Sequence, residues 1–194
     1  GVDRVLAMDL HSAQIQGYFD IPCDHIYGSP VLIDYLETLN LSEIVVVSPD
    51  VGGVARARAF AKLMKDAPLA IIDKRRSAHN ISESLTVIGE VKGKTAILID
   101  DMIDTGGTIC SGGNLLKKEG AEKVFACASH AVFSPPSHER LSMKNLFEQV
   151  IVTNSIPVSQ KDYFPQLKVL SVANMLGEAI WRIHEESSVS SMFR

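Results

Sequence analysis

The chain has 194 residues, of which 46% are hydrophobic and 22% charged, so it can bury the core of an ordinary domain and is not expected to be disordered. Its net charge is −4, and its Lys and Arg residues are scattered rather than clustered. This pattern argues against a nucleic-acid partner but not against binding of small anions. No apolar run approaches the roughly 20 residues of a membrane span, so we expect no membrane segment.

Six short apolar runs rich in β-branched residues predict strands. They occupy residues 5–8, 44–47, 69–72, 95–99, 123–132 and 149–155. Because these runs are continuous rather than alternating, they are typical of strands that are buried on both faces of a parallel sheet. Apolar residues at three- and four-residue spacing predict helices between or after them, at residues 30–39, 54–64, 109–118 and 174–184. The alternation indicates an α/β fold with a doubly wound parallel sheet.

Two stretches lack periodicity. Residues 74–90 begin with polar side chains, and we expect a mobile loop that leads into a hairpin. Residues 133–143 contain the Pro135-Pro136 step, which breaks regular structure. Cys23, Cys110 and Cys127 are too far apart for a disulfide framework or a metal clip and predict reduced thiols in an intracellular protein.

The strongest functional pattern is TAILIDDMIDTGGTI, residues 95–109. A buried strand ends in the paired carboxylates Asp100 and Asp101, and a glycine-containing turn and a helix follow. Glycines let the backbone approach a ligand closely, and N–H groups at a helix start favour a phosphate. The pattern therefore predicts a sugar-phosphate site, with the sugar hydroxyls on the acids and the phosphate on residues Asp104, Thr105, Gly106, Gly107 and Thr108. The structural alternative is a simple turn with an Asp or Thr helix cap.

Residues 97–109, ILIDDMIDTGGTI, are similar to the 5-phosphoribosyl 1-diphosphate motif of type I phosphoribosyltransferases and ribose-phosphate pyrophosphokinases. DLHSAQIQGYFDIPCD, residues 9–24, resembles a signature of the pyrophosphokinases that salvage transferases lack. Residues 45–62, 71–76 and 177–193 also match the pyrophosphokinases in order and spacing. The resemblance covers the full chain, which does not begin with Met and starts near the end of that family's N-terminal domain, so we expect a fragment.

The resemblance implies a division into two parts. Residues 27–194 are expected to form a type I phosphoribosyltransferase-like domain that binds ribose 5-phosphate through Asp100, Asp101 and residues 104–108. Residues 1–26 are expected to be the C-terminal end of a truncated domain of similar fold, with a loop for metal and ATP phosphates.

Several carboxylates and one imidazole in this first segment are candidate ligands of Mg²⁺, which prefers oxygen ligands and keeps several waters. They are Asp9, His11, Asp20 and Asp24. The resemblance places His11 beside the ATP phosphates and their metal. It also makes Asp50, which follows a strand, a metal or ribose contact; the alternative for Asp50 is a helix N-cap.

The resemblance makes Lys74 and Arg76 the cationic pair of a catalytic loop that closes over the transferring phosphates, where phosphoryl transfer needs its charge neutralised. Arg75 has no matched role and is expected to be solvated. Arg56 could face phosphates, and Arg58 is expected on the helix surface. Among the other histidines, His130 is the best candidate, because it lies on the ligand edge of the sheet.

The resemblance implies a ribose-phosphate diphosphokinase with Mg²⁺, ATP and ribose 5-phosphate, and with dimers that assemble into hexamers. The adenine-binding residues of that family lie upstream of Gly1, so we expect the 194 residues alone to be inactive. A salvage phosphoribosyltransferase and a non-catalytic regulatory homologue are the alternatives. Residues 9–24 argue against the first, and Lys74 with Arg76 against the second. The sequence does not distinguish cytoplasm from plastid stroma.

Overall fold

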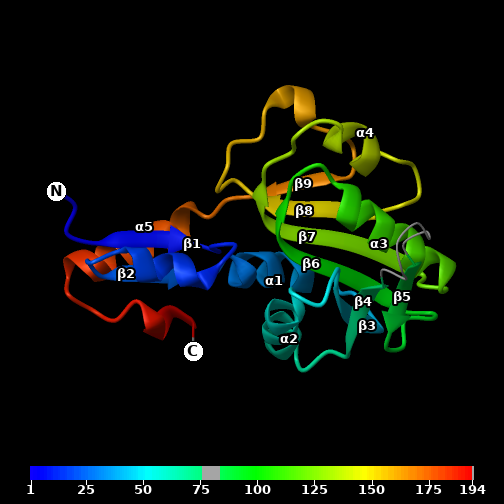
Figure 1. Cartoon of the computed structure of the whole chain (residues 1–194), viewed down its shortest axis with the longest axis horizontal. Helices are drawn as coiled ribbons and strands as arrows, with labels where there is room; N and C mark the ends of the chain where they lie inside the picture. Colours follow the sequence, from blue (N-terminus) through cyan, green and yellow to red (C-terminus); the bar gives the residue numbers. More distant parts are fainter. Residues whose placement is uncertain (76–83, 194) are drawn as a thin grey trace.

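The computed structural model describes residues 1–75 and 84–193, and its centre is a seven-stranded sheet (Figure 1). The strands of this sheet are β3 (Ile44–Ser48), β4 (Leu69–Arg75), β5 (Ser84–Ile88), β6 (Thr95–Ile103), β7 (Lys123–Ala131), β8 (Gln149–Thr153) and β9 (Leu167–Leu170). Their order is β5-β4-β3-β6-β7-β8-β9. Only β5 runs antiparallel to its neighbour, so the sheet is otherwise parallel, as the sequence predicts.

Helices cover both faces of this sheet. α1 (Ser29–Thr38) and α2 (Val54–Leu63) pack on one face, where Phe60 is 1% exposed. α3 (Gly107–Lys118) and α4 (Ser137–Leu141) pack on the other. Successive strand residues such as Val45 and Val46 therefore enter different cores, which explains the continuous apolar runs. The predicted doubly wound α/β fold is confirmed.

The order of the strands fixes where a ligand can bind. The chain passes from β3 to β4 on one side, whereas β6 pairs with β3 on its other side. Open α/β sheets bind ligands beyond the carboxyl ends of the strands at the point where the strand order reverses. In this chain that point lies between the end of β3, at Ser48, and the end of β6, at Ile103.

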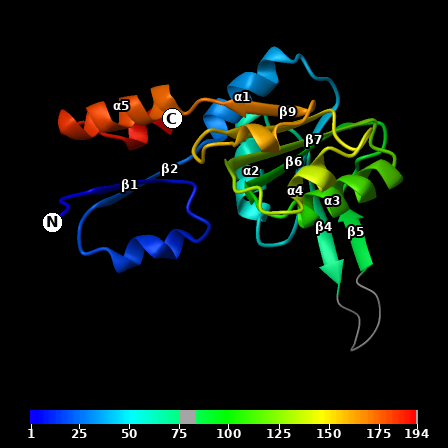
Figure 2. The ribbon, with the colours of Figure 1, turned by 90° about the horizontal axis from the view of Figure 1, so that it is seen from above.

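A smaller unit lies beside the large sheet. It contains the parallel strands β1 (Val5–Met8) and β2 (Cys23–Ile26), which the 3₁₀ helix η1 (Ala13–Tyr18) connects. α5 (Ala173–His184) lies against these two strands in both views (Figures 1 and 2). Ala179 and Ile26 are fully buried between them. The segment from α5 to the 3₁₀ helix η3 (Ser190–Phe193) therefore packs with the first residues of the chain, and the boundary at residues 26 and 27 stays a prediction.

The six predicted strands and four predicted helices are all present, with ends shifted by a few residues. Two strands, β2 and β9, were not predicted. β4 and β5 form the hairpin expected after residue 74, and the residues between them, 76–83, lie outside the described part of the chain. Residues 133–143 contain the short α4, and a further 3₁₀ helix, η2 (Gln160–Asp162), precedes β9.

The three cysteines are free thiols, as expected. Burial raises the pKa of Cys110 to about 11 and raises that of Cys127 as well. Within residues 1–75 and 84–193, no helix has both the length and the apolar character that crossing a membrane requires.

A pair of glycine substitutions tests the packing of α3, the helix that follows the predicted phosphate turn. A Cβ at Gly113 would lie 2.8 Å from the ring of Phe147, which is 3% exposed, so Gly113→Ala should lower the melting temperature. We expect an overpacking cost of about 1–3 kcal/mol.

Gly177→Ala in α5 is the matched control, because a Cβ there meets nothing within 4 Å. It should raise stability by roughly 0.5–1 kcal/mol through helix propensity. Thermal unfolding of both variants measures the difference, and equal shifts of the same sign would contradict the described packing.

Candidate functional site

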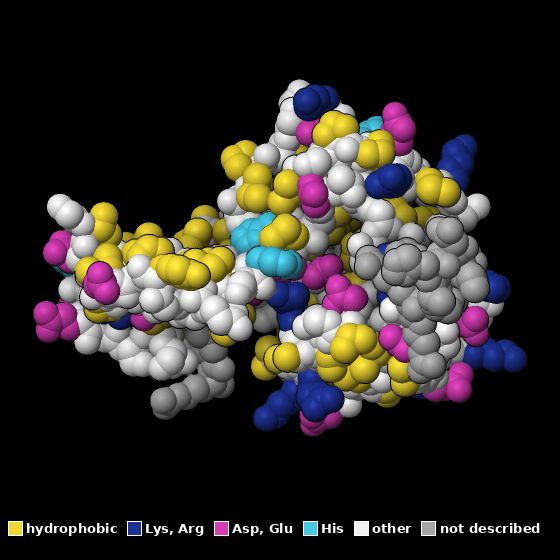
Figure 3. Space-filling model, in the orientation of Figure 1, with side chains coloured by type: hydrophobic (Ala, Val, Ile, Leu, Met, Phe, Trp, Pro, Cys, Tyr) yellow, Lys and Arg dark blue, Asp and Glu magenta, His cyan; other side chains and the backbone are white. Residues whose placement is uncertain are grey.

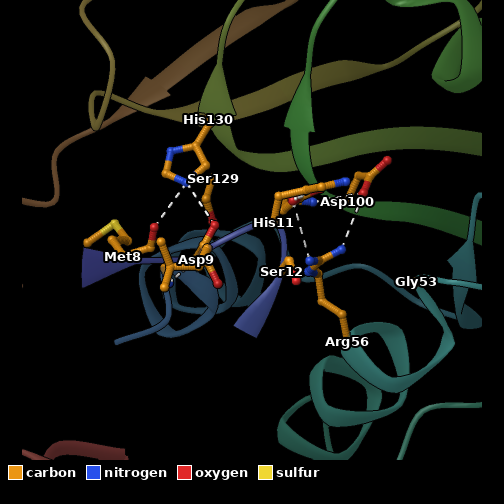
Figure 4. A network of polar contacts seen from close by, with 12 residues as sticks. Met8, Asp9, His11, Ser12, Gly53, Arg56, Asp100, Ser129 and His130 are labelled. Carbon is orange, nitrogen blue, oxygen red and sulfur yellow. Dashed lines mark hydrogen bonds and ion pairs between the residues drawn. The ribbon is translucent and has the colours of Figure 1, made fainter. Parts of the chain in front are cut away.

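The centre of the site is the carboxylate pair at the end of β6. Arg56, which projects from α2, donates to Asp100 Oδ1 at 3.3 Å and lies 3.6 Å from Asp101 Oδ2 (Figure 4). The Asp101 side chain is 2% exposed, whereas that of Asp100 is 21% exposed. The strand thus holds one fully buried and one partly buried carboxyl, both beside one guanidinium.

His11 reaches the same pair from the smaller unit. Its Nδ1 lies 2.7 Å from Asp101 Oδ2, although the two residues are 90 positions apart in the chain. Figure 3 shows histidine, acidic and basic side chains together where the smaller unit meets the larger one. The structure therefore brings His11, Asp100 and Asp101 into one site, and it adds Arg56.

The two carboxyls titrate differently. Burial, together with the hydrogen bond to Asp101, raises the pKa of Asp100 to about 7. Burial also acts to raise the pKa of Asp101, but hydrogen bonds from Asp100 and His11 and the charge of Arg56 outweigh it, so that pKa is lowered. Near neutral pH, Asp101 is therefore ionised while Asp100 can carry a proton.

The turn after the pair has the geometry of an anion cradle. Gly106 has φ +72°, a left-handed conformation that disfavours other residues, and α3 begins at the next residue. No described side chain caps the start of α3, so its first N–H groups point to a position that a phosphate can occupy. Arg140 Nη1 donates to the carbonyl of Thr105 at 3.0 Å and holds the turn from the side. Asp104, Thr105 and Thr108 are exposed.

Asp50 follows β3 by two residues and stabilises the turn before α2, whose N-cap residue is Gly53. Its Oδ1 accepts a hydrogen bond of 2.7 Å from the N–H of Gly53, at the start of α2. Its backbone carbonyl accepts one from Ser48 Oγ at 2.7 Å. Asp50 therefore shapes the turn that leads to Arg56, and its metal or ribose contact stays a prediction.

Two of the other candidate metal ligands, Asp9 and Asp24, form hydrogen bonds outside the carboxylate pair. Asp9 is 7% exposed and accepts hydrogen bonds from Gly28 N and Ser129 Oγ. Asp24 forms two hydrogen bonds with Arg4, and Asp20 is exposed. Within the described ranges, no three His, Cys, Asp or Glu side chains gather closely enough to hold a metal. The residues grouped as metal ligands thus do not form one cluster.

The cationic pair is only partly described. Lys74 is exposed near the end of β4, where its backbone pairs with Leu85. Arg76 lies outside the described residues. Arg58 is exposed on α2, as expected.

Two contacts in the candidate site were not predicted from the sequence. Arg56 was only a candidate for phosphates, yet it pairs with both carboxylates. The sequence feature that could have indicated this contact is the position of Arg56, six residues after Asp50 and near the start of a predicted helix. No sequence pattern indicated the contact between Ser129 and Asp9, because these residues are 120 positions apart in the chain.

Comparison with known proteins gives a family and close relatives. Residues 77–194 match the phosphoribosyl synthetase-associated domain. A ribose-phosphate pyrophosphokinase of Prochlorococcus marinus subsp. pastoris is 91% identical over the whole chain, which corresponds to 59% of its length. A second one, from another Prochlorococcus marinus strain, is 82% identical over the same share. The crystal structure of phosphoribosylpyrophosphate synthetase from Mycobacterium smegmatis superposes with a TM-score of 0.88 at 44% identity, covering 96% of this chain and 60% of that one.

The raised pKa of Asp100 predicts a specific pH dependence of stability. A folded-state pKa above the unfolded value means that the folded protein holds the proton more tightly, so stability falls as the pH rises from 3.8 to about 7. The lowered pKa of Asp101 changes stability only below about pH 3.8, outside this pH range. In Asp100→Asn the fall should be smaller or absent, because the amide has no proton to lose.

Melting temperatures measured between about pH 4 and pH 8 check this expectation. Asp104→Asn removes an exposed carboxylate of the same segment and should keep the fall. Identical pH profiles for the Asp100 variant and the unchanged protein would contradict the raised pKa.

Proposed function

Since this chain belongs to the phosphoribosyl synthetase-associated domain family, we propose that its full-length protein transfers the diphosphoryl group of ATP to the C1 hydroxyl of ribose 5-phosphate. The products are 5-phosphoribosyl 1-diphosphate and AMP. One observation carries the proposal: the carboxylate pair Asp100–Asp101 lies near the carboxyl end of β6, shortly before the Gly106 turn, at the point where the strand order reverses. The chain spans 59% of the length of the two relatives described above, so the activity is proposed for the longer protein.

The ribose 5-phosphate site uses both parts of this arrangement. An ionised Asp101 and a partly protonated Asp100 can together accept from and donate to adjacent ribose hydroxyls. Residues 104–108 receive the 5-phosphate at the start of α3. Arg56 keeps the pair from repelling itself and fixes the orientation of the carboxyl groups.

The reaction forms a bond between the C1 oxygen and the β-phosphorus and breaks the bond from that phosphorus to the oxygen bridging to the α-phosphorus. AMP leaves with the bridging oxygen, and the hydroxyl proton is released. Because negative charge shifts among phosphate oxygens, the protein acts mainly by placing positive groups near them. We assign this role to Lys74 and Arg76, with His11 beside the phosphates.

Magnesium fits this site only as a cation that the nucleotide brings. The described residues hold no ready cluster of three ligands, which suits a metal bound mainly by phosphates and water. His11 and Asp50 are the residues we propose as its protein contacts. The metal would supply further neutralisation of phosphate charge.

Two observations argue against the alternative functions, a salvage phosphoribosyltransferase and a regulatory homologue. A salvage phosphoribosyltransferase needs no segment like residues 9–24, whereas here that segment reaches Asp101 through His11. A regulatory homologue would be expected to lose the loop cations, whereas Lys74 and Arg76 are present. Assembly into dimers and hexamers and an intracellular location belong to the same proposal.

The proposal is tested by incubating the full-length protein with ATP, Mg²⁺ and ribose 5-phosphate and measuring AMP. We expect AMP and 5-phosphoribosyl 1-diphosphate in equal amounts. Release of ADP, or no product at all, would reject the function. Sedimentation of the same sample measures the proposed assembly.

Lys74→Ala tests the role of the cationic pair. If Lys74 acts mainly in the transition state, turnover should fall by about 100-fold or more, while the KM for ATP changes far less. Lys123→Ala is the matched control, because Lys123 is exposed at the amino end of β7, the opposite edge of the sheet.

Steady-state kinetics on the full-length protein separates the two quantities. A large rise in the KM for ATP with unchanged turnover would mean that Lys74 binds the ground state instead.

A further inference from the structure

The His11 side chain is exposed, so its orientation must be fixed by specific contacts. Its side chain is 73% exposed, whereas that of its partner Asp101 is 2% exposed. Neighbouring side chains therefore cannot hold the ring by packing around it. Its direction depends on the Asp101 hydrogen bond and on the backbone that precedes it.

That backbone, residues Met8 to Leu10, is held from three sides. The Asp9 side chain turns inward, where its Oδ2 accepts from Gly28 N at 2.7 Å and from Ser129 Oγ. The N–H of Leu10 donates to His25 Nε2 at 3.0 Å. His130 Nε2 lies 3.1 Å from each of the carbonyl oxygens of Met8 and Asp9, as Figure 4 shows.

The contacts of the His130 ring place a hydrogen on Nε2. Its Nε2 faces two carbonyl oxygens, which only accept hydrogen bonds, so Nε2 carries the hydrogen. Its Nδ1 lies 2.8 Å from Ser155 Oγ. The carbonyl of Ser129 accepts from Thr153 Oγ1 at 2.7 Å and from Ser155 Oγ at 3.0 Å, so Ser129 and His130 belong to one hydrogen-bond network.

Asp9 also has an unusual backbone, with φ +41°. Its side chain is buried and accepts hydrogen bonds from Gly28 and Ser129. A magnesium ligand would instead have to face the phosphates and water.

We propose that Asp9, Ser129 and His130 are positioning residues, which clamp Met8 to Leu10 onto the end of β7 and so direct His11 toward Asp101 and the phosphates. Asp9 then acts as an anchor of this clamp and not as a metal ligand. The inference rests on the proposed function only in taking His11 as the group beside the phosphates.

Two substitutions of Asp9 separate the anchor from a metal ligand. Asp9→Asn keeps an oxygen that can accept both hydrogen bonds and tolerates the left-handed backbone, but it removes the charge. Asp9→Gly also tolerates that backbone but removes the anchor. In the full-length protein we expect Asp9→Asn to keep turnover and the Mg²⁺ dependence within about twofold, and Asp9→Gly to lower turnover by about 10- to 100-fold. A large rise in the Mg²⁺ concentration for half-maximal turnover in Asp9→Asn would overturn the proposal.

A double-mutant cycle tests whether the clamp acts through His11. Ser129→Ala should lower turnover by about tenfold in the unchanged background and have no further effect beside His11→Ala. His130→Gln keeps a donor near the Nε2 position and should retain more activity than His130→Phe. Thr95→Val, which removes a buried hydroxyl at the amino end of β6, is the control for a loss of stability alone.

The outcomes distinguish this inference from the proposed function. If Ser129→Ala lowers turnover by the same factor beside His11→Ala as in the unchanged background, the clamp is wrong and the function stands. If the full-length protein releases no AMP, the function fails. The clamp is then judged by a crystal structure of Asp9→Gly, in which His11 should have left Asp101; an unmoved His11 overturns it.

Discussion

Two carboxylates occupy adjacent positions at the end of β6, and their mutual repulsion is the constraint around which the site is built. A proton on Asp100 and the positive charge of Arg56 relieve this repulsion. His11 adds a hydrogen bond to the buried partner, Asp101. Each relieving group comes from a different segment, so the carboxylate pair also ties α2 and the smaller unit to the central sheet.

This arrangement explains why the smaller unit has a defined position on the larger one. Its own core is small, formed around Ile26, Ala179 and Val189. Polar contacts add to it at the carboxyl edge, where Asp9 bonds to Ser129 and His130 bonds to the backbone of β1. Buried polar groups destabilise the fold little when each forms its hydrogen bonds, but the loss of one partner leaves a buried group unpaired and lowers stability. The same contacts that join the two units therefore place the exposed His11 ring.

Much of the fold followed from the sequence, and the exceptions have identifiable causes. Continuous apolar runs predicted the central strands because these strands are buried on both faces. β2 was missed since CDHI, residues 23–26, contains Asp24 and His25 and has the polarity of a turn. β9 was missed because it has four residues and contains Lys168. The amphipathic pattern of α5 predicted a helix but not its partner, which is the sheet of β1 and β2.

The strand and the glycine turn around the acidic pair of residues 95–109 could be predicted from the sequence alone, because strand burial and turn geometry depend on residues that are neighbours in the chain. The folded structure was needed to show that Arg56 faces Asp100, that His11 faces Asp101 and that Asp9 is buried against Ser129. These contacts span 44, 90 and 120 positions. They depend on the order in which the strands pair and on the packing of the smaller unit, and side chains so far apart in the chain meet only when those choices have been made.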